Sequence, residues 1–301
     1  MRRKKKNPTA IITGDIEIRN HTPLCRTDDY MEAFKRKIKW LKDLQEKYDC
    51  PIFDGGDLFD KKYKQYPSHS LLGWAIKNLP NDIYTVPGNH DLPGKSIENY
   101  KNSAMAVLEE SEIVNVPYPH FLCIDDIGVY GFPWGVEIEQ PTILQSYNVA
   151  LIHTMVYDKF EPFPGCEGYK KEELLDIFPD FDLIVCGHHH QTFTGQKGNT
   201  ILVNPGSLVR NDADQIDHKP CVFLWYAEER RVEKVYTPIE KGVVSRQHID
   251  DKKNKEYRLD AFVEKLGEQT ITGINFEKNL EMSTSGINKN ITDKVWQYFE
   301  G

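Results

Sequence analysis

The sequence lacks several features that would place the protein in a specialised class. It contains no run of about 18 apolar residues, the length that a membrane-spanning helix requires. The apolar run behind the basic start, Ala10 to Ile12, is too short for a signal peptide. Internal repeats and low-complexity tracts are also missing. These absences favour a globular protein of the cytoplasm that does not associate with a membrane.

Two kinds of sequence motif are missing as well. None of the six cysteines stands in a Cys-x-x-Cys pair, so reduced thiols with structural roles are expected rather than a disulfide framework or a zinc ribbon. No Gly-x-Gly-x-x-Gly motif occurs. Gly94-Lys95-Ser96 fails as a phosphate-binding loop because Asn89 stands where the first glycine would be. Nucleotide-powered chemistry within this chain is therefore not expected.

Acidic residues outnumber basic ones, 46 against 38, which gives a formal net charge of −8. This charge argues against strong, indiscriminate attraction to nucleic acid. It does not exclude a nucleic-acid substrate, because cations held by acidic ligands cancel charge locally. The 301 residues are 39% hydrophobic and 28% charged, which is typical of one large folded domain with a small appendage.

Six short apolar runs are predicted to form buried strands, because each is rich in β-branched or aromatic residues and ends in turn residues. They are Ala10–Thr13, Pro51–Phe53, Ile83–Val86, Val149–Ile152, Leu183–Cys186 and Ile201–Val203. Two further segments, His120–Phe132 and Pro220–Pro238, are typical of hairpins. We therefore expect an α/β (α+β) protein whose sheets contain both parallel and antiparallel strands.

Helical patterns occur near both ends of the chain. Apolar residues recur every three to four positions from Met31 to Tyr48, which predicts a helix with Thr27 or Asp28 as its cap. A polar stretch at 241–255 predicts a linker, so we expect a domain at 1–243 and an extension at 244–301. Within the extension, amphipathic helices are expected at 259–267 and 291–299.

Polar residues that suit metal ions follow the predicted strands in order. They are Asp15 with Glu17, Asp57, Asn89 with His90 and Asp91, His153, and His188 with His190. In α/β folds the strand ends open onto the functional site. Carboxylates, an amide oxygen and imidazoles that meet there are the ligands that hard-to-borderline divalent cations prefer. The sequence therefore predicts a metal site.

The ordered motifs resemble those of the calcineurin-like metallophosphoesterases. They are Asp15-x-Glu17, Gly56-Asp57-x-x-Asp60, Gly88-Asn89-His90-Asp91, His153, and Gly187-His188-x-His190. Within that superfamily the chain is similar to SbcD-type DNA repair nucleases, especially their compact phage or bacterial forms. The resemblance spans about Thr9 to Ser207. It implies a β-sandwich of two mixed sheets flanked by helices, followed here by the small C-terminal helical extension.

The resemblance also implies two divalent metal ions bridged by Asp57. The first ion would take Asp15, Glu17, Asp57 and His190, and the second would take Asp57, Asn89, His153 and His188. Manganese is expected, with magnesium, iron or zinc as alternatives. A hydroxide between the ions would attack phosphorus. His90 would lie over the leaving group as general acid or charge stabiliser, oriented by Asp91.

Glu17 departs from the family pattern, which has histidine at this position. A carboxylate suits manganese or magnesium, but its charge should make bound water less acidic. His21 is close in sequence and could partly substitute. Three interpretations stay open: a DNA nuclease, a small-molecule or cyclic-nucleotide phosphodiesterase or phosphatase, and a binding protein with an impaired centre. The DNA nuclease is the interpretation that the motif set favours.

Lys61, Lys62 and Lys64 follow the second motif and alternate with Tyr63 and Tyr66. Basic and aromatic residues beside a phosphoesterase centre could bind a nucleic-acid backbone and stack bases. A solvated loop is the alternative. By the same resemblance, DNA is the expected partner, and a separate SbcC-like ATPase subunit would act in trans.

Several neighbouring polar residues are expected to have supporting roles only. His189 should point away from the metal ions, and Asp60 should brace the site. Asn204 and Ser207 should support a turn beside it.

Overall fold

The computed structural model describes residues 7–60 and 67–251, together with residues 253, 289, 291 and 293. The chain divides into two compact units, residues 1–246 and residues 247–301. The site and the pocket discussed below belong to the first unit. The predicted lysine cluster at 61–64 and the predicted helix at 259–267 lie outside the described residues, as does most of 291–299.

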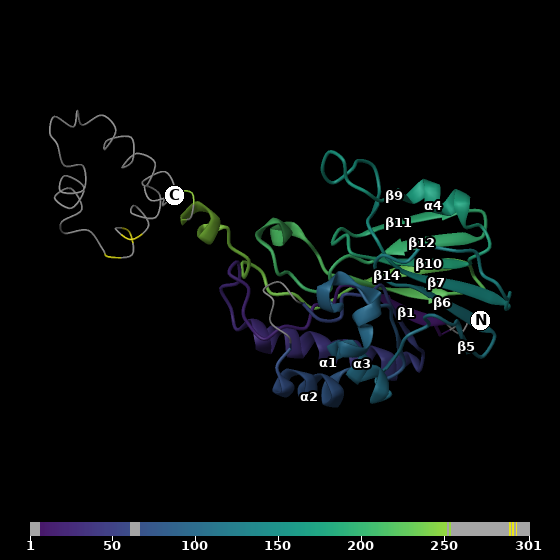
Figure 1. Ribbon diagram of the computed structural model, residues 1–301, viewed down its shortest axis with the longest axis horizontal. Coiled ribbons are helices and arrows are strands. Elements are labelled where there is room, and N and C mark those ends of the chain that lie inside the picture. Colours follow the sequence, from purple (N-terminus) through teal and green to yellow (C-terminus); the bar gives the residue numbers. More distant parts are fainter. Residues whose placement is uncertain are drawn as a thin grey trace, which may run out of the picture. The chain divides into compact units, whose positions relative to one another are not determined.

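Two six-stranded mixed sheets form the framework of the first unit (Figure 1). The first sheet has the order β14-β13-β1-β2-β3-β4 and the second has the order β11-β12-β10-β7-β6-β5. The first sheet contains β1 (Ala10–Thr13), β2 (Ile52–Asp54), β3 (Ile83–Tyr84), β4 (Val114–Asn115), β13 (Cys221–Tyr226) and β14 (Arg231–Tyr236). The second contains β5 (Leu122–Ile124), β6 (Ile127–Phe132), β7 (Tyr147–His153), β10 (Leu183–Gly187), β11 (Phe193–Lys197) and β12 (Thr200–Asn204). Strands β8 (Val156–Tyr157) and β9 (Tyr169–Lys170) form a separate pair.

Each sheet is parallel at its centre and antiparallel at an edge. Strands β1 to β4 are parallel, and β13 and β14 add antiparallel neighbours. In the second sheet β6, β7, β10 and β12 are parallel, while β5 and β11 close the two edges in the antiparallel sense. The predicted sandwich of two mixed sheets is confirmed. Both predicted hairpins and all six predicted strands are present, with limits that differ by up to two residues.

Helices cover the outer face of each sheet (Figure 1). They are α1 (Tyr30–Tyr48), α2 (His69–Asn78), α3 (Ala104–Glu110) and α4 (Lys171–Ile177). The first three pack with β1 to β4 in one apolar cluster, and α4 packs on the second sheet. A further cluster lies between the sheets, so β1 buries Ile11 under α1 and Ile12 against the second sheet. Burial on both faces explains why the central strands are continuously apolar.

Helix α1 begins one or two residues later than its predicted caps, Asp28 or Thr27, imply. Asp29, and neither Thr27 nor Asp28, caps the helix, since its Oδ1 accepts a hydrogen bond of 3.1 Å from the Glu32 amide. The carboxylate of Asp28 is engaged elsewhere, because it binds the guanidinium of Arg26 at 2.8 and 2.6 Å. Within the described residues, short 3-10 helices occur at Pro93–Lys95, Ile97–Asn102 and Ala213–Asp217. No helix in the described part combines the length and hydropathy that a bilayer span requires.

Candidate metal centre

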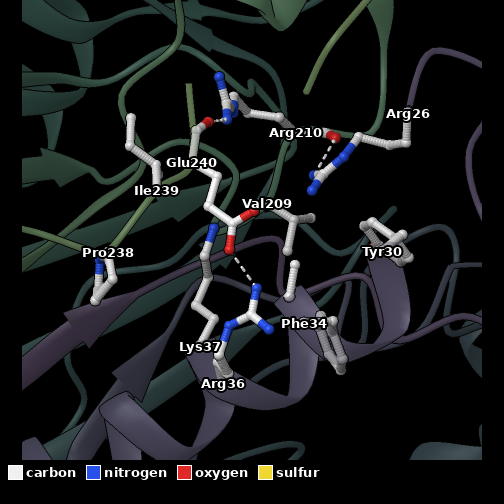
Figure 2. Close-up of a pocket in the computed structure, with 11 residues that line it drawn as sticks. Arg26, Tyr30, Phe34, Arg36, Lys37, Val209, Arg210, Pro238, Ile239 and Glu240 are labelled. Atoms are coloured by element: carbon white, nitrogen blue, oxygen red, sulfur yellow. Dashed lines mark hydrogen bonds and ion pairs between the residues drawn. The ribbon is translucent and has the colours of Figure 1, made fainter. Parts of the chain in front are cut away.

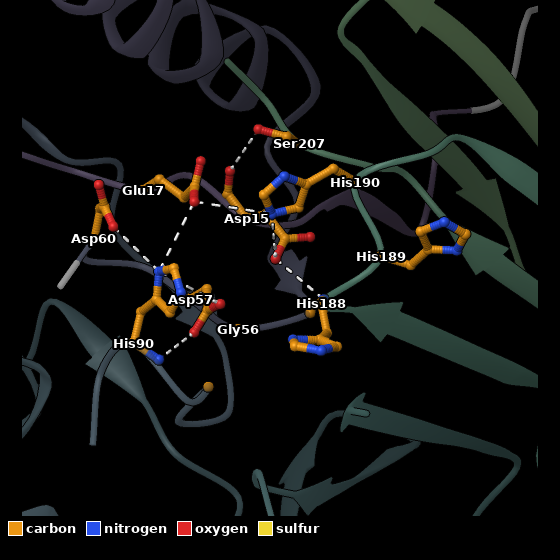
Figure 3. A network of polar contacts seen from close by, with 12 residues as sticks. Asp15, Glu17, Gly56, Asp57, Asp60, His90, His188, His189, His190 and Ser207 are labelled. Atoms are coloured by element: carbon orange, nitrogen blue, oxygen red, sulfur yellow. Dashed lines mark hydrogen bonds and ion pairs between the residues drawn. The ribbon is translucent and has the colours of Figure 1, made fainter. Parts of the chain in front are cut away.

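The predicted metal ligands lie at the edge where the parallel strands of both sheets end. Figure 3 shows five of them close together: Asp15, Glu17, Asp57, His188 and His190. Asp15 and Glu17 follow β1, Asp57 follows β2, Asn89 follows β3, His153 ends β7, and His188 and His190 follow β10. The first five of these donors are buried, and the last two, His188 and His190, are half-buried. Two sheets thus deliver side chains to one place, as strand ends do in layered α/β folds.

One group of donors consists of Asp57, His153 and His188, whose ligand atoms lie within 4.8 Å of one another. Nε2 of His153 lies 3.3 Å from Oδ2 of Asp57 and 3.3 Å from Oδ1 of Asn89. On the other side of the ring, Nδ1 donates to the Gly55 carbonyl oxygen at 2.8 Å. This bond leaves Nε2 facing the other donors, as metal-binding histidines require. These residues match the predicted second ion.

A second group contains Asp15, Glu17 and His190. Nε2 of His190 lies 3.8 Å from Oδ1 of Asp15 and 3.8 Å from Oε1 of Glu17. Donors that share an ion through bonds of about 2.1 Å lie roughly 3 to 4.2 Å apart. Asn211 donates to Oε2 of Glu17 at 2.7 Å, and Gln215 lies 3.3 Å from Nδ1 of His190. The positions suit the predicted first ion, with Asn211 and Gln215 holding two of its ligands from outside.

His90 is held by Asp60. Oδ1 of Asp60 lies 3.2 Å from Nδ1 of His90, and Oδ2 forms an ion pair with the buried Arg19. Asp60, His90 and Glu17 also lie close enough to share a metal ion. Because both oxygens of Asp60 already face cationic partners, Asp60 is better suited to position His90 than to bind metal. Burial alone would lower the pKa of His90, but Asp60, Asp57 and Glu17 raise it to about 9.

The prediction that Asp91 orients His90 is wrong. The carboxylate of Asp91 accepts hydrogen bonds from the backbone amides of Leu58 at 3.2 Å, Phe59 at 2.8 Å and Gly88 at 3.0 Å. Asp91 therefore ties the loop after β2 to the loop after β3. The carboxylate is turned to these amides and not to the neighbouring imidazole, so it fixes the position of the loop that carries His90.

Four of the predicted ligands have a left-handed backbone conformation. The φ angles are 46° at Asp15, 53° at Glu17, 52° at Asp57 and 81° at His188. Residues other than glycine rarely adopt such angles, and the surrounding structure must hold them there. Part of that support is visible, since the amide of His188 donates to Oδ1 of Asp15 at 3.1 Å. Strain concentrated at these positions indicates a functional site.

Two glycines allow the loops to approach one another. A Cβ atom at Gly88 would lie 2.0 Å from Oδ1 of Asp57, and one at Gly187 would lie 2.1 Å from the carbonyl oxygen of Gly55. Any side chain at either position would push apart the loops that carry the donors.

The charges of the site fit bound cations. Burial raises the pKa of Asp15 and of Glu17 even though His190 opposes the shift. Oδ2 of Asp15 is buried and receives no hydrogen bond from the described residues. Burial lowers the pKa of His188 to about 3, which keeps its imidazole neutral, the form that binds metal. Buried carboxylates require compensating cations, so this donor set is suited to divalent metal ions.

The residues expected to have supporting roles lie close by. His189 points away from the donors (Figure 3), with Nδ1 at 2.8 Å from the Val156 carbonyl oxygen. The side chain of Asn204 donates to the carbonyl oxygens of His189 and Gln191, both at 2.6 Å. Ser207 donates to the carbonyl oxygen of Asp15 at 3.4 Å.

The structure adds residues that the sequence did not reveal. Asn211 stands 194 positions from Glu17, and no motif links the two. Arg19 and Gln215 likewise belong to no sequence motif that predicted a role at this site. The ring centroid of Trp134 lies 4.8 Å from that of His188. Its place just after β6 is a strand-end position, which is the one signal that could have found it.

The fold and the donor set define a metal-dependent phosphoesterase. The model of the calcineurin-like phosphoesterase family matches residues 8–192. This is more than half of the chain, which therefore belongs to that family.

Individual relatives are distant. An uncharacterized protein of Acanthamoeba polyphaga mimivirus is 23% identical over 282 residues, which cover 83% of this chain and 20% of that protein. The chain thus spans about a fifth of the length of this relative. Two solved structures are similar to this chain. One is the protein TT1561 of Thermus thermophilus, and the other is an archaeal phosphodiesterase. The first is 15% identical, with 76% of this chain and 99% of that chain covered and a TM-score of 0.47. The second is 13% identical, with 75% of this chain and 98% of that chain covered and a TM-score of 0.41.

Proposed function

We propose that the protein is a two-metal phosphodiesterase that hydrolyses DNA in the cytoplasm, similar to SbcD-type nucleases. The observation that supports the proposal is the meeting of two donor groups at one sheet edge, and Asp57 is the proposed bridge between them. An SbcC-like ATPase subunit acting in trans belongs to the same proposal.

The proposed first ion takes Asp15, Glu17, Asp57 and His190, and the proposed second takes Asp57, Asn89, His153 and His188. When bound, two such ions lower the pKa of a water molecule and offset charge on the phosphoryl oxygens. Manganese is the proposed metal because three of the four ligands in the first group are carboxylates, with magnesium, iron and zinc as alternatives.

His90 is the proposed general acid for the leaving oxygen. Asp60 holds its Nδ1, and Oδ1 of Asp57 accepts the backbone amide of His90 at 2.8 Å. With Nδ1 and the backbone both held, Nε2 is the ring atom left for a substrate. A positioned imidazole of this kind contributes roughly 100- to 10,000-fold to such reactions.

Two features favour DNA over a small ester. Trp134 is half-buried beside His188, where an aromatic face could stack a base. The sequence that follows Asp60 carries Lys61, Lys62 and Lys64, so basic side chains come directly after the residue that holds His90.

The test is digestion of end-labelled linear DNA and of circular DNA in the presence of manganese, beside bis-para-nitrophenyl phosphate. We expect DNA cleavage that stops with EDTA and returns with added manganese. The Asp57→Asn variant should lose the activity, while Asp43→Asn, on the exposed side of α1, should retain it.

Other outcomes would overturn the substrate or the activity. Hydrolysis of the chromogenic diester with intact DNA would point to a small phosphodiester as substrate. Bound metal with no hydrolysis of either compound would point to a binding protein whose centre is impaired at Glu17.

A further inference from the structure

A polar pocket lies against helix α1, and none of the proposed metal ligands lines it (Figure 2). Its volume is about 260 Å³, which is below the roughly 300 Å³ at which pockets for drug-sized ligands begin. Its lining includes Arg26, Tyr30, Lys37, Arg210 and Glu240. The size suits one small chemical group, and the lining is rich in cationic side chains.

Lys37 is the unusual member of this lining. It lies on the buried face of α1, three residues after Phe34 and four before Leu41, where the helical pattern calls for an apolar residue. Its Nζ donates to the Leu208 carbonyl oxygen at 2.6 Å. An ammonium group has three donors, and Lys37 forms no ion pair with a carboxylate of the described residues.

Arg210 is also buried, with 6% of its surface exposed. It donates to the backbone carbonyl oxygen of Glu240 at 2.6 Å, and it too forms no ion pair with a described carboxylate. The other two cations are balanced, because Arg26 binds Asp28 and Arg36 pairs with the Glu240 carboxylate. Lys37 and Arg210 therefore line the pocket without an ion pair to a carboxylate of the described part of the chain, and the carboxylate that acts on Arg210, that of Asp28, is already paired with Arg26.

This imbalance has a cost that a bound anion would remove. Burial, together with the neighbouring Arg26 and Arg210, lowers the pKa of Lys37 to about 7. Burial of a charge without an ion-pair partner is unfavourable. Lys37 interrupts the apolar pattern of α1 at this cost, which indicates a role other than packing.

We propose that this pocket binds a phosphate group through Lys37 and Arg210. A guanidinium offers paired donors that match phosphate oxygens, and an ammonium adds a compact charge. Asn211, the residue next to Arg210, donates to Glu17 of the metal centre. The phosphate could therefore belong to a DNA strand, at a position other than the one that is cleaved, or it could be free inorganic phosphate. The proposal does not depend on DNA being the substrate.

Isothermal titration of the metal-loaded full chain with inorganic phosphate tests the pocket. The titration is repeated with EDTA, because phosphate also binds metal ions, and binding that EDTA does not remove is assigned to the pocket. We expect this binding to weaken at least tenfold in Lys37→Met and in Arg210→Gln. Lys39→Met is the matched control, since Lys39 lies on the same helix with a 74% exposed side chain, and it should bind like the native chain.

A native chain without EDTA-resistant phosphate binding at millimolar concentration would overturn the proposal. So would equal binding by the native chain and by both variants, once circular dichroism shows that they are folded. Two variants at separate positions guard against the misfolding of either one.

Kinetics then distinguish the two sources of the phosphate. If a DNA phosphate occupies the pocket, Lys37→Met should raise KM for an oligonucleotide severalfold and leave KM for bis-para-nitrophenyl phosphate unchanged. If free phosphate occupies it, both KM values should stay constant while phosphate binding is still lost. Absence of DNA cleavage would refute the proposed nuclease function, whereas the titration would still decide separately whether the pocket binds phosphate.

Discussion

Replacing Lys37 with methionine should stabilise the protein at neutral pH. The buried ammonium is favourable in the unfolded chain and unfavourable in the folded one, where only the Leu208 carbonyl oxygen binds it. Methionine keeps the length of the side chain and removes the charge. The expected change is therefore a gain in the free energy of unfolding, which is unusual for a substitution on a buried helix face.

The magnitude follows from the pKa of Lys37, 10.5 as the ordinary value and about 7 in the folded protein. Between these two values the unfolded chain binds more protons than the folded chain, so the stability of the native protein rises with pH. The slope cannot exceed about 1.4 kcal/mol per pH unit. At pH 7 and below, the buried ammonium destabilises the folded protein by roughly 4 kcal/mol, the sum of this slope over the range between the two pKa values. The methionine variant avoids this cost but loses the hydrogen bond to Leu208, which is worth about 1 kcal/mol. The expected net gain in the free energy of unfolding at pH 7 is therefore about 3 kcal/mol.

Urea unfolding at pH 7, 8 and 9 measures this effect, in a buffer without phosphate because an anion in the pocket would mask it. The difference between Lys37→Met and the native chain should shrink by about 1 kcal/mol for each pH unit. Lys39→Met should follow the native chain at every pH. If the free energies of unfolding of Lys37→Met and of the native chain change with pH in parallel, the pKa of Lys37 is not lowered. If Lys37→Met is much less stable than the native chain at all three pH values, burial of the Lys37 ammonium is not unfavourable.

The remaining predictions concern the metal centre. Asp57→Asn should lower the bound metal from two ions per chain to one or none, as measured by elemental analysis after dialysis; two retained ions would contradict its bridging position. His90→Gln should lower kcat roughly 100- to 10,000-fold with metal content unchanged, and a native kcat would exclude it as the acid. Gly88→Ala, whose new Cβ would lie 2.0 Å from Oδ1 of Asp57, should weaken metal affinity at least tenfold in a calorimetric titration; native affinity would show that the loop can shift without effect.

Much of the fold was predictable because its signals are local. The strands stand out as apolar runs that end in turn residues, and β1 has the predicted limits, Ala10–Thr13. The helix pattern from Met31 to Tyr48 identified α1 to within one residue. In both cases burial on defined faces sets the spacing of apolar residues. The ligand positions followed from the same logic, since each polar motif comes directly after a strand.

The errors and omissions at the metal centre involve contacts between distant segments. Asp91 is adjacent to His90 in the chain, which suggested a pairing, but its oxygens are taken by three backbone amides from two loops. Asp60, 30 positions earlier, fills that role instead. The support that Asn211 gives Glu17 likewise depends on how the loop after β12 returns to β1. Side-chain partners of this kind have no periodicity, so only the assembled structure reveals them.

The surroundings of Glu17 show how the site accommodates a carboxylate at the position where the resemblance led us to expect histidine. Oε2 accepts the hydrogen bond from Asn211 at 2.7 Å and lies 4.0 Å from the buried guanidinium of Arg19. Oε1 is left facing His190 at 3.8 Å and His90 at 3.9 Å. Asn211 and Arg19 thus offset the charge on Oε2, while Oε1 faces the metal donors. A carboxylate with one oxygen held in this way offers a metal ion a single oriented donor, which is also what an imidazole offers. The added negative charge is shared with Arg19, so the substitution changes the electrostatics of the centre less than the formal charge suggests.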